Sequence, residues 1–339
     1  MLVAPDSFKG TFSAARVAEA IGRGLVSEGV KVDLCPVADG GEGTLDALAG
    51  AFACELREVA VRDPLGRPVQ ATYGLGRLPR GQTVAVIETA AASGLGLVAA
   101  QERDAVAAST YGTGELIAAA VNEGAAVIYL GVGGSATTDG GAGAIEAIER
   151  GGGLRDSKLV VLCDVRTRFT DAARVFAPQK GATAAQVRSL ARRLERMAQR
   201  LARDPREVAM TGAAGGLSGG LWAACDAELH PGAAFVLDAL GYDARMRDAR
   251  AVVTGEGKLD EQSLAGKLIS EIATRARQAG VPCHAIVGTR ELDAFGARVL
   301  DLGTILEART LVELESAGRR LANVVGITAA DRGHDSGPA

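Results

Sequence analysis

The sequence predicts an α/β protein of two domains. Three observations carry this prediction. The chain has 339 residues, short apolar runs alternate with helical patterns towards both of its ends, and three extended runs without intervening helices interrupt that alternation. Apolar residues make up 47% of the chain and charged residues 23%, and this composition excludes an intrinsically disordered protein.

The first elements form two strand–helix pairs. Residues 2–4 are an apolar run that predicts a strand, and residues 13–26 show helical periodicity with Ser13 at the expected N-cap. Residues 31–37 and 43–52 repeat the same order of strand and helix. The beginning of the chain is therefore expected to contribute to a parallel sheet.

The pattern then changes from strand–helix to strand–strand units. Residues 55–61, 69–75 and 83–87 are extended runs with no helix between them. The turn sequence Asp63-Pro64-Leu65-Gly66 separates the first two runs. This change predicts a domain boundary near residue 62.

Alternation of strands and helices resumes in the rest of the chain. Further strands are expected at residues 126–130, 158–163, 251–254 and 283–287, and helices at 114–122, 184–203, 267–279 and 311–321. The last residues, 327–339, are polar and are expected to form a tail.

Charge and the rarer residue types exclude several classes of protein. The 37 basic and 41 acidic residues give a net charge of −4, which argues against a nucleic-acid-binding protein. Three histidines are too few for a histidine-based zinc site. The five cysteines are scattered without a C-x-x-C motif, which predicts reduced thiols and a cytoplasmic location. We expect no signal peptide and no membrane span.

Glycine is unusually frequent and is clustered. The chain has 45 glycines, about 13% of its residues against a usual share of roughly 7%. Four clusters carry polar or acidic residues, at positions 39–44, 131–141, 212–220 and 255–260. A glycine-rich turn between a strand and a helix lets several backbone N–H groups face one anion, and nearby carboxylates can hold Mg²⁺. These clusters therefore predict a nucleotide–metal site.

Known nucleotide and hydrolase motifs fit poorly. A Walker A loop is absent because Gly266-Lys267 is followed by Leu268, and no G-x-S-x-G elbow occurs. Gly131-x-Gly133-x-x-Ala136 matches the dinucleotide fingerprint after a predicted strand, but residues 146–156 contain no following strand. A nicotinamide-dependent oxidoreductase that uses this loop stays open as an alternative.

The glycine clusters belong to a longer series of nine segments, at residues 4–10, 38–44, 88–95, 112–117, 133–143, 163–165, 176–182, 212–220 and 254–257. In this order they resemble the class I family of bacterial glycerate kinases over almost the whole chain. The resemblance implies an ATP- and Mg²⁺-dependent kinase that phosphorylates D-glycerate, usually to 2-phosphoglycerate. It implies small-molecule partners without nucleic acid or membrane, and it allows a homodimer.

The resemblance also implies the domain arrangement. A flavodoxin-like parallel-sheet domain would be built from both chain ends, residues 1–62 plus 281–326. A mixed α/β domain would be inserted at residues 63–280.

Two segments depart from the family pattern. Only residues 144–162 separate Gly143 from the Cys-Asp-Val segment, fewer than is usual in the family. Residues 166–170 read Arg-Thr-Arg-Phe-Thr where the family has Asn-Pro-Leu and more glycines. A kinase-like binding protein with weakened catalysis therefore stays open as a second alternative.

The candidate catalytic residues lie at strand ends. Asp39 is the expected general base, because the adjacent Gly40-Gly41 pair lets a substrate approach closely, and Asp139 is the second candidate for this role. Lys9, beside Ser7, is expected to hold the carboxylate of glycerate.

The other candidate residues are assigned by their chemistry. The expected substrate-binding residues are Ser7, Gly40, Gly41, Glu42 and Lys180. The expected ATP-binding residues are Gly133, Gly134, Ser135, Thr137, Gly255 and Glu256. The expected Mg²⁺ ligands are Asp139, Glu256 and Asp260.

Overall fold

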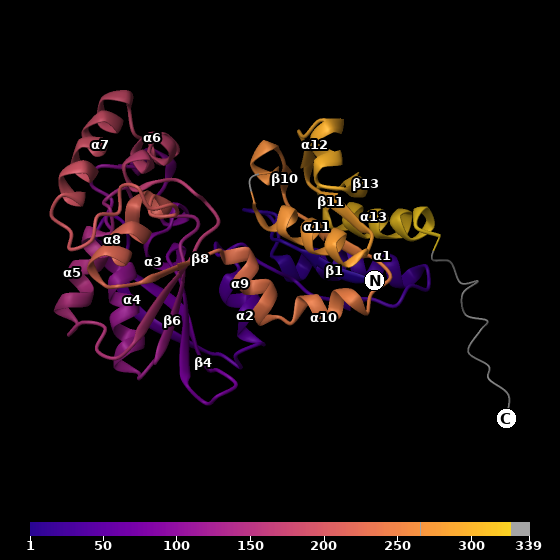
Figure 1. Cartoon of the computed structure of the whole chain (residues 1–339), viewed down its shortest axis with the longest axis horizontal. Coiled ribbons are helices and arrows are strands. Elements are labelled where there is room, and N and C mark those ends of the chain that lie inside the picture. The colour runs from indigo at the N-terminus through magenta and orange to yellow at the C-terminus, as the bar shows by residue number, and fades with distance from the viewer. Residues whose placement is uncertain (265, 327–339) are drawn as a thin grey trace. The chain divides into compact units, whose positions relative to one another are not determined.

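The computed structural model describes residues 1–264 and 266–326, which fall into two compact units. Unit 1 combines Met1–Ala38 with the described residues from Val236 onward, and unit 2 is Asp39–Phe235. In Figure 1 the indigo start of the chain and its orange-to-yellow end lie in the same unit. The predicted tail, residues 327–339, lies outside the described residues.

Unit 1 is built on a five-stranded parallel sheet. Its strand order is β2-β1-β9-β11-β13. Counted within this sheet alone, the order is 2-1-3-4-5, which is the flavodoxin-like order. The strands are β1 (Leu2–Pro5), β2 (Asp33–Leu34), β9 (Val252–Gly255), β11 (Cys283–Val287) and β13 (Leu302–Glu307). A separate parallel pair is formed by β10 (Lys258–Leu259) and β12 (Thr289–Arg290).

Helices cover both faces of this sheet. Ile286 of β11 packs with α1 (Ala14–Ser27) and α13 (Leu311–Val324), whereas its neighbour Ala285 packs with α11 (Leu268–Ala279) on the opposite face. Helices of this kind provide the crossover connections that neighbouring parallel strands require. The unit also contains α10 (Tyr242–Arg247), η6 (Glu261–Leu264) and α12 (Ala294–Val299), and α9 (Gly232–Ala239) spans the boundary between the units.

Helix α1 begins and packs as its sequence predicts. The Ser13 hydroxyl accepts a hydrogen bond from the backbone N–H of Arg16 at 3.4 Å, so Ser13 is the N-cap. α1 also approaches α13 very closely, because a Cβ at Gly24 would lie 2.0 Å from the carbonyl oxygen of Glu315. Only glycine permits that distance between the two backbones.

Unit 2 is built on a six-stranded mixed sheet of order β3-β4-β5-β6-β7-β8. The first three strands pair antiparallel, and β5 to β8 pair parallel. Their bounds are β3 (Glu55–Arg62), β4 (Pro68–Arg77), β5 (Thr83–Glu88), β6 (Val127–Gly131), β7 (Lys158–Leu162) and β8 (Glu228–His230). The parallel pairing brings the carboxyl ends of β5, β6 and β7 to one edge, where Glu88, Gly131 and Leu162 are in register.

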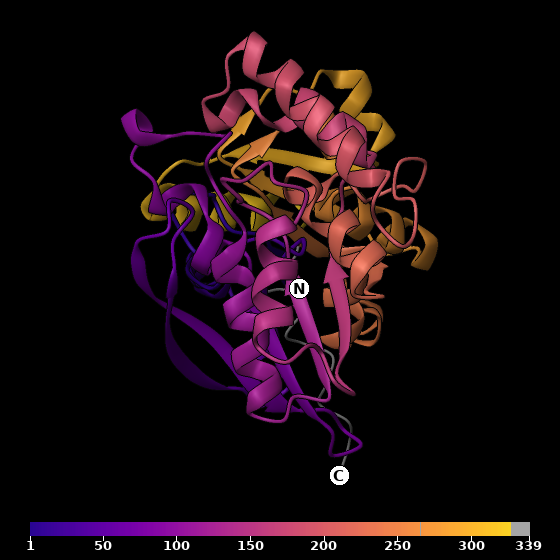
Figure 2. The same cartoon turned by 90° about the vertical axis from the view of Figure 1, so that its left-hand side faces the viewer.

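Helices α4 and α5 run alongside each other over one face of this sheet (Figure 2). Their backbones nearly touch, because a Cβ at Gly114 would lie 2.4 Å from the carbonyl oxygen of Ala144. The α-helices of the unit are α2 (Thr44–Ala49), α3 (Ala90–Ser93), α4 (Tyr111–Asn122), α5 (Ala142–Arg150), α6 (Ala172–Phe176), α7 (Ala184–Ala198) and α8 (Leu217–Ala224). Its short 3₁₀ helices are η1 (Leu95–Leu97), η2 (Ala100–Glu102), η3 (Phe169–Asp171), η4 (Pro178–Lys180) and η5 (Ala213–Gly216).

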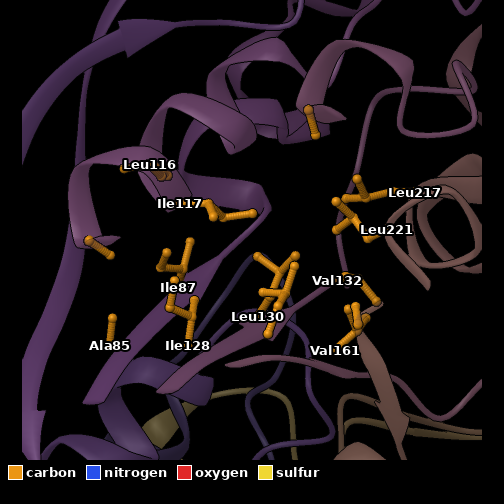
Figure 3. Close-up of a cluster of buried hydrophobic side chains, with 14 of the residues drawn as sticks. Ala85, Ile87, Leu116, Ile117, Ile128, Leu130, Val132, Val161, Leu217 and Leu221 are labelled. Carbon is orange, nitrogen blue, oxygen red and sulfur yellow. The ribbon is translucent and has the colours of Figure 1, made fainter. Parts of the chain in front are cut away.

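The core of unit 2 lies between these helices and the sheet. Figure 3 shows Ile117 of α4 near the strand residues Ile87 and Leu130, and Leu217 and Leu221 of α8 belong to the same buried cluster. Truncating a buried isoleucine or leucine of this kind to alanine costs about 2–5 kcal/mol.

The predicted α/β class, with a flavodoxin-like parallel sheet made from both chain ends, is confirmed. The boundaries between the units differ from the expected residues 62 and 281. They lie after Ala38 and after Phe235. β3 pairs with β4 along its whole length and therefore stays with unit 2, while β9 pairs with β1 and so belongs to unit 1.

Several elements were not expected from the sequence. Helix α5 and strand β13 are absent from the predicted series, and the helix expected at 184–203 ends at Ala198. None of the helices in the described part of the chain has the length and apolar character that a membrane span requires.

Candidate functional site

Two of the predicted glycine-rich loops come together in unit 2. They are residues 39–43 and 133–139, and they meet at the edge where β5, β6 and β7 end. A Cβ at Gly133 would lie 2.5 Å from the Cα of Gly41, and one at Gly131 would lie 2.8 Å from the carbonyl oxygen of Gly40. The glycines are therefore needed because the two loops touch backbone to backbone.

Asp39 begins the first of these loops and is partly exposed. Its Oδ1 accepts a hydrogen bond from the backbone N–H of Gly41 at 3.1 Å, which orients the carboxylate. The exposed Glu42 lies against the second loop, since a Cβ at Gly134 would be 2.9 Å from Glu42 Oε1. The geometry of Asp39 is compatible with a proton acceptor that a substrate can reach.

Asp139, in contrast, is buried and its carboxylate accepts four hydrogen bonds. Its oxygens accept hydrogen bonds from the backbone N–H groups of Gly141 (3.1 Å) and Gly143 (3.2 Å), at the start of α5. They also accept from Thr110, through its N–H at 2.9 Å and its hydroxyl at 2.8 Å. A carboxylate offers about four lone-pair positions. Asp139 therefore anchors the loop and two helix starts, and its expected roles as base and metal ligand stay predictions.

Lys180 lies beneath the second loop. Its side chain is 2% exposed, and Nζ donates hydrogen bonds to Ser135 Oγ at 2.9 Å and to the carbonyl oxygen of Thr137 at 2.5 Å. Burial lowers the pKa of Lys180 to about 7, and the negative charge of Asp139 opposes this shift. The structure thus places Lys180 as a support of the loop, where the sequence predicted a substrate-binding residue.

Ser135 and Thr137 differ in what their hydroxyls contact. Ser135 Oγ accepts the hydrogen bond from Lys180. Thr137 Oγ1 is buried and has no hydrogen-bond partner among the described residues. A buried hydroxyl without a partner is a group that a bound ligand or water would satisfy.

Unit 1 has its own polar edge, where β1, β9 and β11 end. The turn after β1 carries Ser7 and Lys9, and the turn after β9 carries Glu256. The two turns adjoin, because a Cβ at Gly257 would lie 3.4 Å from the Cα of Phe8. Lys9 is exposed, while the Ser7 hydroxyl is buried without a hydrogen-bond partner in the described part of the chain. The last residue of β9, Gly255, permits a close approach, since its Cβ would lie 2.2 Å from the carbonyl oxygen of Ile286.

Glu256 is a second titratable group with a strongly shifted pKa. Burial raises the pKa of Glu256 to about 7, and the hydrogen bond from Ser263 and the charges of Lys267 and Lys9 oppose the shift. The Ser263 hydroxyl donates to Glu256 Oε1 at 2.5 Å and accepts from the backbone N–H of Asp260 at 3.1 Å. Ser263 therefore connects the Glu256 carboxylate to the backbone of Asp260, the second residue expected to bind metal in this unit.

No three histidine, cysteine, aspartate or glutamate side chains gather as a metal site within the residues that the structure describes. Glu256 and Asp260 are close enough for the charge of Asp260 to raise the pKa of Glu256 further. Mg²⁺ in kinases is commonly held by one or two carboxylates together with phosphate oxygens and water. A pair of carboxylates therefore fits that mode of binding.

The third glycine cluster, residues 212–220, serves packing. A Cβ at Gly219 would lie 2.5 Å from the ring of Phe169, and one at Gly220 would lie 2.0 Å from the carbonyl oxygen of Gly140. Phe169 belongs to the segment 166–170 that departs from the family pattern, and it is fully buried. Phe169 is therefore part of a packed core, whereas Arg166 and Arg168 of the same segment are exposed.

The dinucleotide fingerprint at Gly131 lacks its structural context. In that motif the glycines open a helix, so that a pyrophosphate meets its N-terminus. Here α5 begins only at Ala142, well after Gly134. The oxidoreductase alternative therefore has no support in the geometry of this loop.

Sequence reasoning assigned no role to three residues that organise these edges: Glu88, Thr110 and Ser263. Glu88 accepts backbone hydrogen bonds from Gly43 and Leu45, and its position at the end of an apolar run was the one available signal. Thr110 and Ser263 lie in loops, and their partners come from distant or irregular segments.

Comparison with known proteins agrees with these motifs. A model of the glycerate kinase family matches residues 1–157 and 149–325. The glycerate kinase of Bacillus subtilis (strain 168) is 40% identical, and the alignment covers 98% of this chain and 96% of that protein. The glycerate 2-kinase of Escherichia coli (strain K12) is 36% identical, with coverage of 91% and 92%.

A solved structure agrees as well. A crystal structure assigned as a glycerate kinase 2 from Salmonella typhimurium LT2 has a TM-score of 0.79 and 33% sequence identity. The match covers 96% of this chain and 98% of that chain. With a family model, close relatives and a solved structure each matching nearly the full length, the chain belongs to the glycerate kinase family.

Proposed function

We propose that this protein catalyses the ATP- and Mg²⁺-dependent phosphorylation of D-glycerate, with 2-phosphoglycerate as the product. The observation that carries the proposal is the contact between the two glycine-rich loops of unit 2 at the carboxyl edge of its parallel strands. That contact sets the partly exposed Asp39 beside a loop suited to phosphate. Membership of the glycerate kinase family supports the same reaction.

Phosphoryl transfer depends mainly on positioning and on neutralisation of charge. In this proposal the loop at Gly133 and Gly134 binds phosphate oxygens through the backbone N–H group of Gly134 and the hydroxyl of Thr137. Lys180 holds their loop in place through Ser135 and the Thr137 carbonyl. Gly255 and Glu256 of unit 1 are also proposed ATP-binding residues.

Glu256 and Asp260 are the residues that would hold Mg²⁺, which would supply positive charge to offset the charge of the phosphoryl group. Ser263 keeps the Glu256 carboxylate oriented by its short hydrogen bond.

The substrate would be recognised by acidic and basic groups together. Asp39 is the proposed general base that accepts the proton of the glycerate hydroxyl. Lys9 is the proposed partner of the glycerate carboxylate, with Ser7 beside it. Gly40 and Gly41 leave room for the substrate, and Glu42 is the further proposed contact.

The decisive experiment is an assay of the purified protein with ATP, Mg²⁺ and D-glycerate. ADP release together with ³¹P NMR of the product would distinguish 2-phosphoglycerate from 3-phosphoglycerate. We expect no ADP release after chelation of Mg²⁺, and a loss of 10²–10⁴-fold in kcat for Asp39→Asn, the typical contribution of a general base. Absence of ADP release combined with oxidation of NADH would overturn the proposal in favour of an oxidoreductase. ATP binding without turnover would favour a binding protein.

The proposed setting of the enzyme is the cytoplasm. All five cysteines are unpaired thiols, which suits a reducing compartment. We propose small molecules as its ligands, and a homodimer would be checked by sedimentation of the purified protein.

A further inference from the structure

Glu88 ties the first site loop to the sheet of unit 2. It is the last residue of β5 and stands in register with Gly131 of β6. Its Oε1 accepts hydrogen bonds from the backbone N–H of Gly43 at 2.9 Å and from that of Leu45 at 2.8 Å. One side chain of a strand therefore fixes the point at which the loop turns into α2.

The loop cannot make this connection with its own side chains. Gly43 occupies the N-cap position of α2 with a φ of 94°, and it has no side chain that could accept from the helix. Within the loop, Asp39 Oδ1 accepts from Gly41 N and the Thr44 hydroxyl donates to Gly41 O, but both bonds join neighbouring residues. They shape the loop without anchoring it to the sheet.

The contact between loops 39–43 and 133–139 is too weak to fix the orientation of loop 39–43 by itself. Gly41 and Gly133 meet through backbone atoms, and the bond from Gly133 N to Gly40 O is long at 3.4 Å. Two short hydrogen bonds to a carboxylate oxygen are stronger than one long bond between neutral groups.

We infer that Glu88 is a positioning residue for the reaction, because it holds the loop that carries Asp39 and Glu42 in its working orientation. The inference rests on the proposed function, in which Asp39 is the general base. A displacement of about 1 Å in a catalytic group can cost roughly 10²-fold in rate. Loss of the anchor is therefore expected to lower kcat, while the KM for ATP changes less.

A substitution by glutamine separates the effect of the Glu88 hydrogen bonds from the effect of its charge. Both backbone donors bind Oε1, so a glutamine in this position would still offer its amide oxygen to them. Burial, with the neighbouring charges of Asp46 and Glu42, raises the pKa of Glu88 to about 7, and the hydrogen bonds from Leu45 and Gly43 oppose this shift. The side chain is thus partly neutral near pH 7, which makes the neutral glutamine a close substitute.

The test compares Glu88→Ala and Glu88→Gln with a matched control, Glu115→Ala. Glu115 of α4 likewise accepts a backbone hydrogen bond, from Arg62 N at 2.7 Å, but it lies outside both site loops. We expect a 10- to 100-fold fall in kcat for Glu88→Ala at temperatures where the variant is fully folded. Glu88→Gln should stay within about threefold of the wild type, and Glu115→Ala should lower the melting temperature without a change in kcat.

Hydrogen exchange of the Gly43 and Leu45 amides gives a readout that does not depend on the substrate. Exchange should accelerate at least tenfold in Glu88→Ala and remain slow in Glu88→Gln. Rapid exchange in a wild-type protein that fails to phosphorylate glycerate would overturn both proposals, whereas slow exchange with no turnover would overturn the proposed function alone. Normal kcat in Glu88→Ala, or equal loss in Glu88→Gln and Glu88→Ala, would overturn the role of Glu88 as a hydrogen-bonding anchor.

Discussion

Replacement of Lys180 by methionine should remove a pH dependence from the stability of unit 2. In the unfolded chain the lysine has its ordinary pKa of 10.5, whereas burial lowers the pKa of Lys180 in the folded protein to about 7. Between these values the unfolded chain holds a proton that the folded protein has released. The free energy of unfolding therefore rises with pH in this range.

The magnitude follows from the two pKa values. One proton difference changes the free energy of unfolding by about 1.4 kcal/mol per pH unit, so the wild type should gain about 2 kcal/mol between pH 7 and pH 9 from this site. Lys180→Met has no titrating group at this site, so its free energy of unfolding gains nothing there between pH 7 and pH 9. The methionine also leaves the Thr137 carbonyl and Ser135 hydroxyl without their donor, which costs about 1–3 kcal/mol at every pH.

The protein carries a suitable probe for this measurement. Trp222 is the single tryptophan of the chain and lies in α8 of unit 2, with the Arg203 guanidinium 3.7 Å from its ring centroid. Urea unfolding followed by its fluorescence reports the unit that contains Lys180. The difference between wild type and Lys180→Met should widen by about 2 kcal/mol from pH 7 to pH 9.

Other groups titrate in the same range, but they do so in both proteins and cancel in the difference. Lys158→Met is the matched control, because Lys158 is an exposed lysine of the same unit, paired with Glu228 at 2.8 Å. Its difference from the wild type should be the same at both pH values. If Lys180→Met gained as much stability as the wild type, the lysine would not be buried as described.

Three further predictions concern the site loops. Asp139→Asn should lower the free energy of unfolding by about 2–4 kcal/mol, because an amide cannot accept all four hydrogen bonds. Urea unfolding measures this change. Unchanged stability with lost turnover would instead favour the role of Asp139 as the general base. In wild-type kinetics the KM for Mg·ATP should fall as pH rises from 6 to 8, because Glu256 ionises near pH 7, and the same fall in Glu256→Gln would contradict this. Gly133→Ala should lower kcat at least tenfold, because its Cβ would meet Gly41. Gly50→Ala is the control and should match the wild type, since Gly50 has open space around it and an ordinary φ of −68°. Equal kcat in the two variants would refute the contact between Gly133 and Gly41.

The sequence predicted best where the signal is local. Residues 39–43 and 133–139 were found because glycine runs follow apolar strands, and the ends of parallel strands share an edge. The boundaries of the units were placed differently because they depend on pairing between distant strands. Nothing in residues 251–254 alone shows that β9 lies beside β1.

The roles of the charged residues were harder to predict, because sequence shows the type of a side chain but not its burial. Lys180 and Asp139 both belong to polar, glycine-rich segments and were therefore expected to bind ligands. The structure buries both: Lys180 donates to the 133–139 loop, and Asp139, at the end of that loop, accepts from the backbone of Gly143. Residues of the same types at Lys9 and Asp39 reach the surface.

The same limit applies to the glycines and explains why composition alone cannot separate a phosphate loop from a packing motif. Gly41 and Gly219 both occur in clusters that the sequence treats alike. Gly41 faces another glycine loop at the ends of strands, a setting in which backbone N–H groups can bind an anion. Gly219 faces the ring of Phe169, which fills the space that a side chain at Gly219 would occupy. What a glycine run does therefore depends on the residue opposite it, and that residue is fixed by the fold.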